Sequence, residues 1–236
     1  MSAPTFLESS LARLRKATLP LQSVSRPRSL GAEGDAQRID TLVTGLVSKK
    51  PDVIIALTSP AVLALKQAGV VTPVVFAFVT DPVRQGIVAS LAHPGGNFTG
   101  VTYSEATLGG KRLDLLLDAL PGTRHIAVIW SRSFSENAAI FDVIRQAAQA
   151  RGVEVFPKEL EGVQEDGGLM SYGPDLGESY RGTAALADKV LKGAHPADLP
   201  VEEPTQFSLC INLKTAKALG STIPPMFLAR ADQVIE

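Results

Sequence analysis

Two uninterrupted apolar runs, residues 53–57 and 73–79, dominate the first half of the chain. A half-buried strand alternates apolar and polar residues, so runs without alternation predict strands that are covered on both faces in a parallel sheet. Between the runs, residues 59–68 begin with Ser-Pro, are mostly apolar and are followed by Gly69, which predicts a helix with proline in its first turn. The unit is therefore βαβ, and we expect parallel strands joined by a right-handed crossover.

A second unit of the same kind follows at 125–156, where an apolar run, a polar corner, an amphipathic helix and another strand succeed one another. This duplication predicts an α/β fold with two similar lobes or one longer doubly wound sheet. Residues 39–47 place apolar side chains at helical spacing, so a helix here is expected to pack on the first sheet. Further strands are predicted at 98–102, 168–174 and 207–212, and further helices at 108–120, 176–191 and 213–219.

Polar residues stand where the first two predicted strands end. Thr58 and Ser59 follow the first strand, and Thr80 and Asp81 follow the second. In open parallel sheets, ligands bind beyond the carboxyl ends of the strands, where helix N-termini expose unpaired N–H groups. Hydroxyl groups at such a helix start suit a carboxylate or another small anion. The alternative is that Ser59 and Asp81 only cap the helices that follow them, and the local sequence favours this reading.

Composition narrows the classes of function. Of the 236 residues 45% are hydrophobic, and 23 basic residues almost cancel 24 acidic ones. A net charge near zero argues against binding to a nucleic-acid backbone. No apolar stretch approaches the roughly 18 residues of a membrane span, so we expect no membrane insertion. The single cysteine, Cys210, allows neither an intrachain disulfide nor a thiolate metal cluster.

The sequence contains no pattern that demands catalysis. Neither Gly-rich nucleotide fingerprint occurs, no serine has a nucleophile-elbow context, and the three histidines match no metal spacing. We therefore expect no enzymatic activity, no cofactor and no metal. Tyr103 and Tyr172 close predicted strands, which favours a core or hinge role over stacking on a ligand. Asn137 is equally consistent with capping its helix and with contacting a ligand.

Several ordered blocks resemble one known family. The blocks are GIVASLA at 86–92, PGGNFTGV at 94–101, GKRL at 110–113, GGLMSYGP at 167–174 and INLKTAKALG at 211–220. In order and content they resemble the ABC-transporter substrate-binding proteins of the tryptophan/tyrosine-binding type, and the resemblance extends over most of the chain. It implies a two-lobed α/β fold of the periplasmic-binding-protein type (type I). It also implies capture of a small-molecule solute, in some members an aromatic amino acid, for delivery to an ABC permease.

The resemblance also implies a division of the chain and a set of ligand contacts. Lobe one would span 1–103, with 1–34 poorly defined, and lobe two 104–167. The segment 168–200 would return to lobe one, and 201–236 would form the last crossover and a lobe-two segment. By position, the solute in the interlobe cleft would meet Thr58, Ser59, Thr80 and Asp81 in lobe one, Thr102 and Tyr103 at the first crossing, Ser135 and Asn137 in lobe two, and Tyr172 and Gly173 at the return crossing.

The chain departs from the family's pattern in two places. Family members normally begin with an export signal and a first strand before the helix predicted at 6–14, and neither is visible here. The resemblance implies a periplasmic location, whereas the missing signal favours the cytoplasm. Near 160–166 the family holds further helices and strands, which seven residues cannot supply. We therefore expect a truncated, internally deleted member with an open sheet face in lobe two, self-association and impaired binding.

Two other functions stay open as alternatives. A cytoplasmic small-molecule sensor would explain the missing export signal, although no helix-turn-helix precedes residue 35 and the neutral charge argues against DNA contact. A nucleotide-using α/β enzyme is the less favoured alternative, because both Gly-rich fingerprints are absent.

Overall fold

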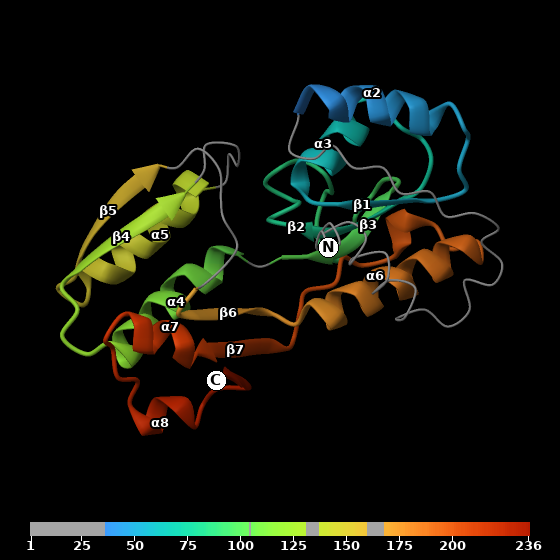
Figure 1. Ribbon diagram of the computed structural model, residues 1–236. Helices are drawn as coiled ribbons and strands as arrows, with labels where there is room; N and C mark the ends of the chain where they lie inside the picture. Colours follow the sequence, from blue (N-terminus) through green and yellow to red (C-terminus); the bar gives the residue numbers. More distant parts are fainter. Residues whose placement is uncertain (1–35, 104, 131–136, 160–167) are drawn as a thin grey trace. The chain divides into compact units, whose positions relative to one another are not determined.

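The computed structural model of the chain describes residues 36–103, 105–130, 137–159 and 168–236 (Figure 1). The helix predicted at 6–14 lies outside the described residues. The chain divides into two compact units: unit 1 contains Met1–Tyr103 and Asp175–Thr205, and unit 2 contains Ser104–Pro174 and Gln206–Glu236. Among the described residues, no helix combines the length and the apolar character that a membrane crossing needs.

Unit 1 is built on a three-stranded parallel sheet in the order β1-β2-β3. The strands are β1 (Ile54–Leu57), β2 (Val74–Val79) and β3 (Phe98–Thr102). Both strand pairs are parallel, which confirms the βαβ prediction. The outer edge of β3 is covered by the segment at Glu202, whose backbone exchanges hydrogen bonds with Gly100 and Thr102. Among the described strands, β2 therefore lies at the centre of the sheet and β1 at an edge.

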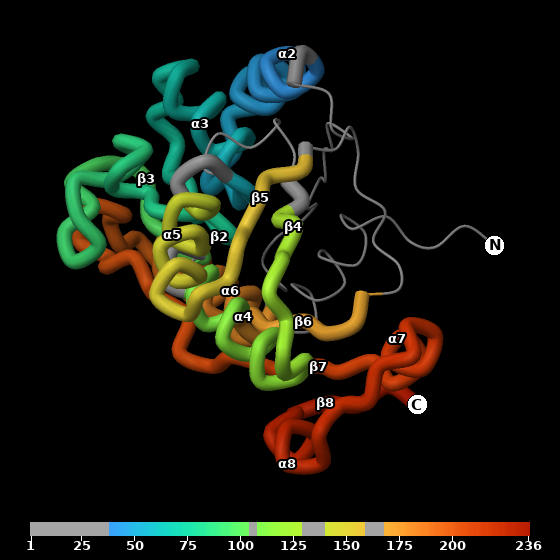
Figure 2. Tube along the Cα trace, turned by 90° about the vertical axis from the view of Figure 1, so that its left-hand side faces the viewer, coloured from blue at the N-terminus to red at the C-terminus, as the bar shows by residue number. Residues whose placement is uncertain are grey.

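Helices cover both faces of this sheet. Apolar residues of α2 (Ala36–Val47) and α3 (Ser59–Gln67) pack with one face of β2. Residues of α6 (Leu176–Leu191) pack with the other, and the two views in Figures 1 and 2 agree on this arrangement. A 3-10 turn, η2 (Pro196–Asp198), lies in the connector that follows α6.

Burial along the sheet corrects one expectation from the sequence. The central strand β2 has four successive residues with no exposed surface, Val74 to Ala77, as its apolar run predicts. The run that forms β1 was expected to be covered on both faces as well, but Ile55 is 36% exposed. Ile55 is exposed because β1 lies at the edge of the sheet, near the border of the helix layer, whereas the central strand β2 lies beneath the helices.

Unit 2 contains two separate small sheets. The parallel pair comprises β4 (His125–Trp130) and β5 (Glu154–Glu159). The other sheet has the order β6-β7-β8, antiparallel between the first two strands and parallel between the last two. Its strands are β6 (Met170–Pro174), β7 (Phe207–Asn212) and β8 (Gln233–Ile235), and the unit's helices are α4 (Glu105–Ala119), α5 (Asn137–Gln149), α7 (Leu213–Ala218) and α8 (Pro225–Leu228).

The β4–β5 sheet is covered by helices on one face. Side chains of α4 and α5, among them Leu113 and Ala148, pack against Ile126 and Val155. On the opposite face, Phe156 is 47% exposed. Within the described residues, this parallel sheet therefore has fewer strands and fewer covering helices than the sheet in unit 1, and the incompleteness expected for the second lobe stays a prediction.

The borders between the units differ in part from those expected. The first lies at 103/104 in both descriptions. The sequence placed the return to lobe one before residue 168, whereas β6 belongs to unit 2 and unit 1 resumes at Asp175. The reason is strand pairing: β6 forms a ladder with β7 from Met170 to Pro174, which ties it to the C-terminal segment.

A close approach in the core of unit 1 requires glycine at position 100. A Cβ atom built on Gly100 would overlap the Phe76 carbonyl oxygen and would lie 2.6 Å from atoms of the Phe76 ring. Gly45 in α2, by contrast, has no neighbouring atom within 4 Å of such a Cβ. Replacing glycine with alanine therefore tests core packing at position 100 and helix propensity of the backbone at position 45.

We expect Gly100→Ala to lower the free energy of unfolding by about 3 kcal/mol, because the added methyl group overpacks the core. Gly45→Ala should raise it by about 1 kcal/mol, because alanine favours an exposed helix. Urea denaturation followed by circular dichroism measures both values. Equal effects of the two substitutions would contradict the packing described for Phe76.

Candidate functional site

The carboxyl ends of β1 and β2 bring the two predicted polar corners to one edge of the sheet. Leu57 pairs with Ala77 in the parallel register, and the N–H of Thr58 donates to the Ala77 carbonyl oxygen at 3.0 Å. Thr58 and Ser59 therefore lie beside the chain that continues from β2 through Thr80. We call this edge the unit 1 corner; it comprises Thr58, Ser59, Thr80, Asp81, Gln85 and Thr102.

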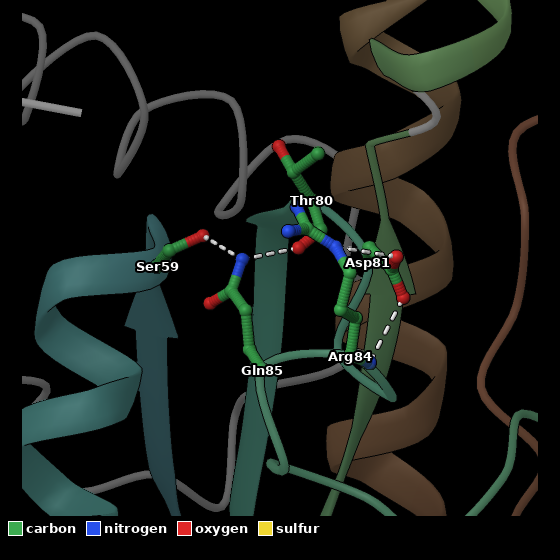
Figure 3. A network of polar contacts seen from close by, with 5 residues as sticks. All are labelled: Ser59, Thr80, Asp81, Arg84 and Gln85. Atoms are coloured by element: carbon green, nitrogen blue, oxygen red, sulfur yellow. Dashed lines mark hydrogen bonds and ion pairs between the residues drawn. The ribbon is translucent and has the colours of Figure 1, made fainter. Parts of the chain in front are cut away.

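A glutamine links the two halves of the unit 1 corner (Figure 3). The side-chain amide of Gln85 donates to the Ser59 hydroxyl oxygen at 3.3 Å and also to the Thr80 carbonyl oxygen. Ser59 is only 7% exposed, while the Thr80 side chain points away from Gln85. Gln85 is not among the site residues predicted from the sequence, because a lone glutamine in a polar loop carries no periodic or motif signal.

The Asp81 carboxylate stabilises the turn that follows it. One carboxylate oxygen accepts from the Arg84 N–H at 3.0 Å, and the other accepts from the Arg84 Nε at 3.1 Å (Figure 3). Residues 82–86 form a turn rather than a helix, so the carboxylate caps a turn. Both side chains are largely exposed, at 40% for Asp81 and 56% for Arg84, and an ion pair of this kind contributes little to stability.

The start of α3 leaves backbone donors at the unit 1 corner. Thr58 is the N-cap residue, but its side chain makes no capping hydrogen bond. Pro60 has no N–H, and the N–H groups of Ser59 and Ala61 lie in the first turn, where a helix provides no acceptor for them. An anion is favoured at such a position by these donors and by the helix dipole.

Backbone strain gathers at the same edge. Within the described residues, three of the four non-glycine residues with positive φ are Thr58 (75°), Phe78 (57°) and Asp81 (43°). With ψ at 149°, Thr58 occupies a region that only glycine adopts readily. Strain of this kind persists only where the surrounding structure enforces it, and it is typical of binding sites. The strain therefore marks the corner independently of its hydroxyl groups.

The positive φ of Phe78 accompanies a bulge in β2. The register between β2 and β3 shifts between Ala77 and Val79, and the bulged Phe78 side chain packs on α6. Its ring meets Tyr180 edge to face at 5.1 Å between centroids, and it meets Tyr103 at 6.3 Å. Tyr180 is buried and Tyr103 half-buried, so an aromatic cluster lies at the ends of β2 and β3.

Thr102 contributes a buried hydroxyl group. Its backbone N–H donates to the Glu202 carbonyl oxygen at 2.9 Å, and its side chain lies opposite Val79 in the sheet. Thr102 is 4% exposed, and its Oγ1 has no hydrogen-bond partner among the described residues. Because a buried hydroxyl group without a partner is costly, this atom is a place where a ligand or a water molecule would be stabilised.

The site residues predicted from unit 2 are described less fully. Ser135 lies outside the described residues, and Asn137 is the first residue of α5, with its side chain outside the described part. Tyr172 and Gly173 lie in β6, where they pair with Leu209 and Ser208. The Tyr172 ring stacks on Phe207 at 5.9 Å, and its carbonyl oxygen accepts from the Arg112 Nε at 2.8 Å.

The donor set of the unit 1 corner suits a small polar solute. Hydroxyl groups, backbone N–H groups and an exposed carboxylate are ligands for carboxylates and ammonium groups rather than for soft metals. Within the part of the chain that the structure describes, no cluster of three histidine, cysteine, aspartate or glutamate residues could hold a metal ion. Six of the site residues predicted from the sequence thus lie at one edge of unit 1: Thr58, Ser59, Thr80, Asp81, Thr102 and Tyr103.

Comparison with known proteins gives three consistent findings. A sequence model of the ABC transporter substrate binding proteins matches residues 28–157 and 136–235. A tyrosine-binding protein of Clostridioides difficile (strain R20291) is 25% identical over 238 residues, which cover 80% of this chain and 68% of that protein. The family's pattern thus matches in two stretches that together span most of the chain.

Two solved structures share the fold. One is an ABC domain from Streptococcus pneumoniae in complex with L-Trp, with a TM-score of 0.84 and 24% identity, covering all of this chain and 97% of that chain. The other is a conserved domain protein from Vibrio cholerae, with a TM-score of 0.83 and 22% identity, covering 96% of this chain and 95% of that chain. At these identities the likeness is one of fold.

The strain at Thr58 makes a testable stability prediction. Thr58→Gly should raise the free energy of unfolding by about 1 kcal/mol, because relief of the positive φ outweighs the entropy that glycine adds to the unfolded chain. Thr44→Gly, the same exchange in the exposed helix α2, should lower it by about 0.5 kcal/mol. Chemical denaturation of both variants measures the difference. Destabilisation by Thr58→Gly would show that the backbone at Thr58 is unstrained.

Proposed function

This chain belongs to the ABC transporter substrate binding protein family, and from that premise we propose that it captures an amino acid, with aromatic amino acids as the first candidates. Solute binding is the role of the family, which is not a family of enzymes. Proteins of this type typically act outside the cytoplasm and deliver their solute to an ABC permease. We propose the same location and the same partner here.

The unit 1 corner is the observation that carries the choice of an amino acid. The carboxylate of the solute would accept from the N–H groups of Ser59 and Ala61 and from the Ser59 hydroxyl, at the positive end of α3. Gln85 already holds the Ser59 side chain in place at 3.3 Å. Thr102, whose buried hydroxyl has no partner among the described residues, would supply a further polar contact.

Aromatic side chains beside this corner favour an aromatic amino acid. The half-buried ring of Tyr103 and the ring of Phe78 provide a surface on which an aromatic solute can stack or pack edge to face. The tyrosine-binding relative and the L-Trp complex of the same fold support this class of solute. The exposed Asp81 carboxylate belongs to the corner, and its ion-pair partner among the described residues is the exposed Arg84, so it would be available to an ammonium group.

We propose that affinity is reduced by the incomplete unit 2. Within the described residues, its parallel sheet has two strands and is covered by helices on one face. The contacts of the solute with unit 2 stay predictions; they involve Ser135, Asn137, Tyr172 and Gly173. In this proposal unit 1 supplies the contacts to the carboxylate, so a variant at Ser59 tests the proposal most directly.

Ser59→Leu should weaken the binding of L-tryptophan and L-tyrosine by about a hundredfold, because it removes a hydrogen bond to a charged group and fills the space beside the helix start. Isothermal titration calorimetry measures the dissociation constants. Ser48→Leu, the same exchange at an exposed position at the end of α2, is the matched control and should leave binding unchanged.

Far-UV circular dichroism of both variants verifies that they are folded. Unchanged affinity in a folded Ser59→Leu variant would contradict the placement of the carboxylate.

A thermal-shift screen of the unmodified chain tests the class of solute, because a ligand that binds the folded state raises the melting temperature. Stabilisation by nucleotides but not by amino acids would overturn the proposed function.

A further inference from the structure

One face of the β4–β5 sheet, which no described helix covers, carries a short, ordered pattern of side chains. In the parallel register His125 lies beside Glu154 and Ala127 beside Phe156. Glu154, Phe156 and Lys158 are all exposed, and they alternate with the residues of β5 that face α4 and α5. The face thus presents an aromatic ring between an acidic and a basic residue on one strand.

Parallel sheets in proteins are normally covered on both faces. Here α4 and α5 lie on the same side of β4 and β5 (Figure 2), and the opposite side leaves Phe156 47% exposed. A two-stranded sheet is marginally stable by itself, so a second cover on this side would stabilise the unit. The exposed ring is therefore a candidate contact for such a cover.

The outer edge of β5 is poorly suited to pairing with another strand. The N–H of Glu154 donates to the Arg124 carbonyl oxygen at 2.8 Å, so the even-numbered residues of β5 direct their N–H groups toward β4. Position 157 therefore faces the outer edge, and it is a proline with no N–H to donate. A partner is accordingly expected on the face of the sheet rather than along this edge.

We propose that a second copy of this chain covers this face in a two-fold dimer. In this dimer the two-fold axis lies between the two sheets, perpendicular to the strands and level with Phe156. The β5 strands of the two copies then run in opposite directions, so Glu154 of each copy lies over Lys158 of the other and the two Phe156 rings meet at the centre. Lys158 has no ion pair within the described residues, while Glu154 contacts only the exposed His125, at 3.5 Å. The charge pattern is therefore complementary to itself.

The size of the face sets the strength of the dimer. The five exposed residues described on this face lie on two adjacent strands and cover roughly 20 Å by 10 Å, on the order of 200 Å². A stable interface typically buries about 800 Å² on each partner. The dimer is therefore weak and depends on concentration, and substitutions of single residues on this face have large relative effects on it.

Sedimentation equilibrium of the full chain over a wide range of concentration tests this dimer. The unmodified chain should shift from monomer to dimer as concentration rises. Phe156→Ser should abolish the shift, whereas Met226→Ser, which removes an 84% exposed apolar residue of α8 elsewhere in unit 2, should preserve it. Far-UV circular dichroism verifies that both variants are folded.

Charge reversal tests the two-fold arrangement. E154K places two lysines, and K158E two glutamates, opposite each other in the homodimer, so each variant alone should dimerise about tenfold more weakly. An equimolar mixture of the E154K and K158E chains restores both ion pairs, and it should associate as tightly as the unmodified chain. The double variant E154K/K158E should also associate normally.

Three results would overturn the proposal. The first is a monomer at all concentrations, which would indicate that other residues of the same chain cover the face. The second is association that Phe156→Ser leaves unchanged, which would place the contact elsewhere. The third is a mixture of E154K and K158E chains that associates no better than either variant alone.

Discussion

The structure of unit 1 depends on the parallel pairing of β1 and β2, with β2 buried on both faces. Four successive residues of β2 have no exposed surface, which requires helices on both sides of the sheet. Because the strands run in the same direction, their carboxyl ends coincide, and the crossover helix α3 begins at that edge. Polar residues cannot continue the buried strands, so they collect at the same edge as the free donors of the helix start.

The unit 1 corner combines polar groups with a strained backbone. Thr58 and Phe78 both have positive φ at the points where the chain leaves or bends β1 and β2. The bend at Phe78 moves an aromatic ring onto α6, beside Tyr180 and Tyr103. Gln85 holds Ser59 and the Thr80 carbonyl oxygen in one network across the two strand ends. One constraint, the end of a buried strand, thus accounts for the position of the hydroxyl groups and of the rings.

The same rule explains why unit 2 differs from unit 1. The sheet in unit 1 has three strands and two covered faces, whereas the β4–β5 sheet has two strands and helices on one face. The short connection at 160–166, which lies outside the described residues, leaves no length for a further crossover unit. In the proposed dimer, a second copy would provide beside Phe156 the cover that unit 1 obtains from its own helices.

The sequence by itself determined the βαβ unit, the helices within a few residues of their ends, the polar corners and the family, because apolar periodicity, turn residues and ordered blocks are local signals. It did not determine the exposure of Ile55, the role of Gln85 or the assignment of β6 to unit 2. These features arise from contacts between residues distant in the sequence, or from a strand's place in its sheet. Only the tertiary structure decides them, since the same residues at another edge or register would have different partners.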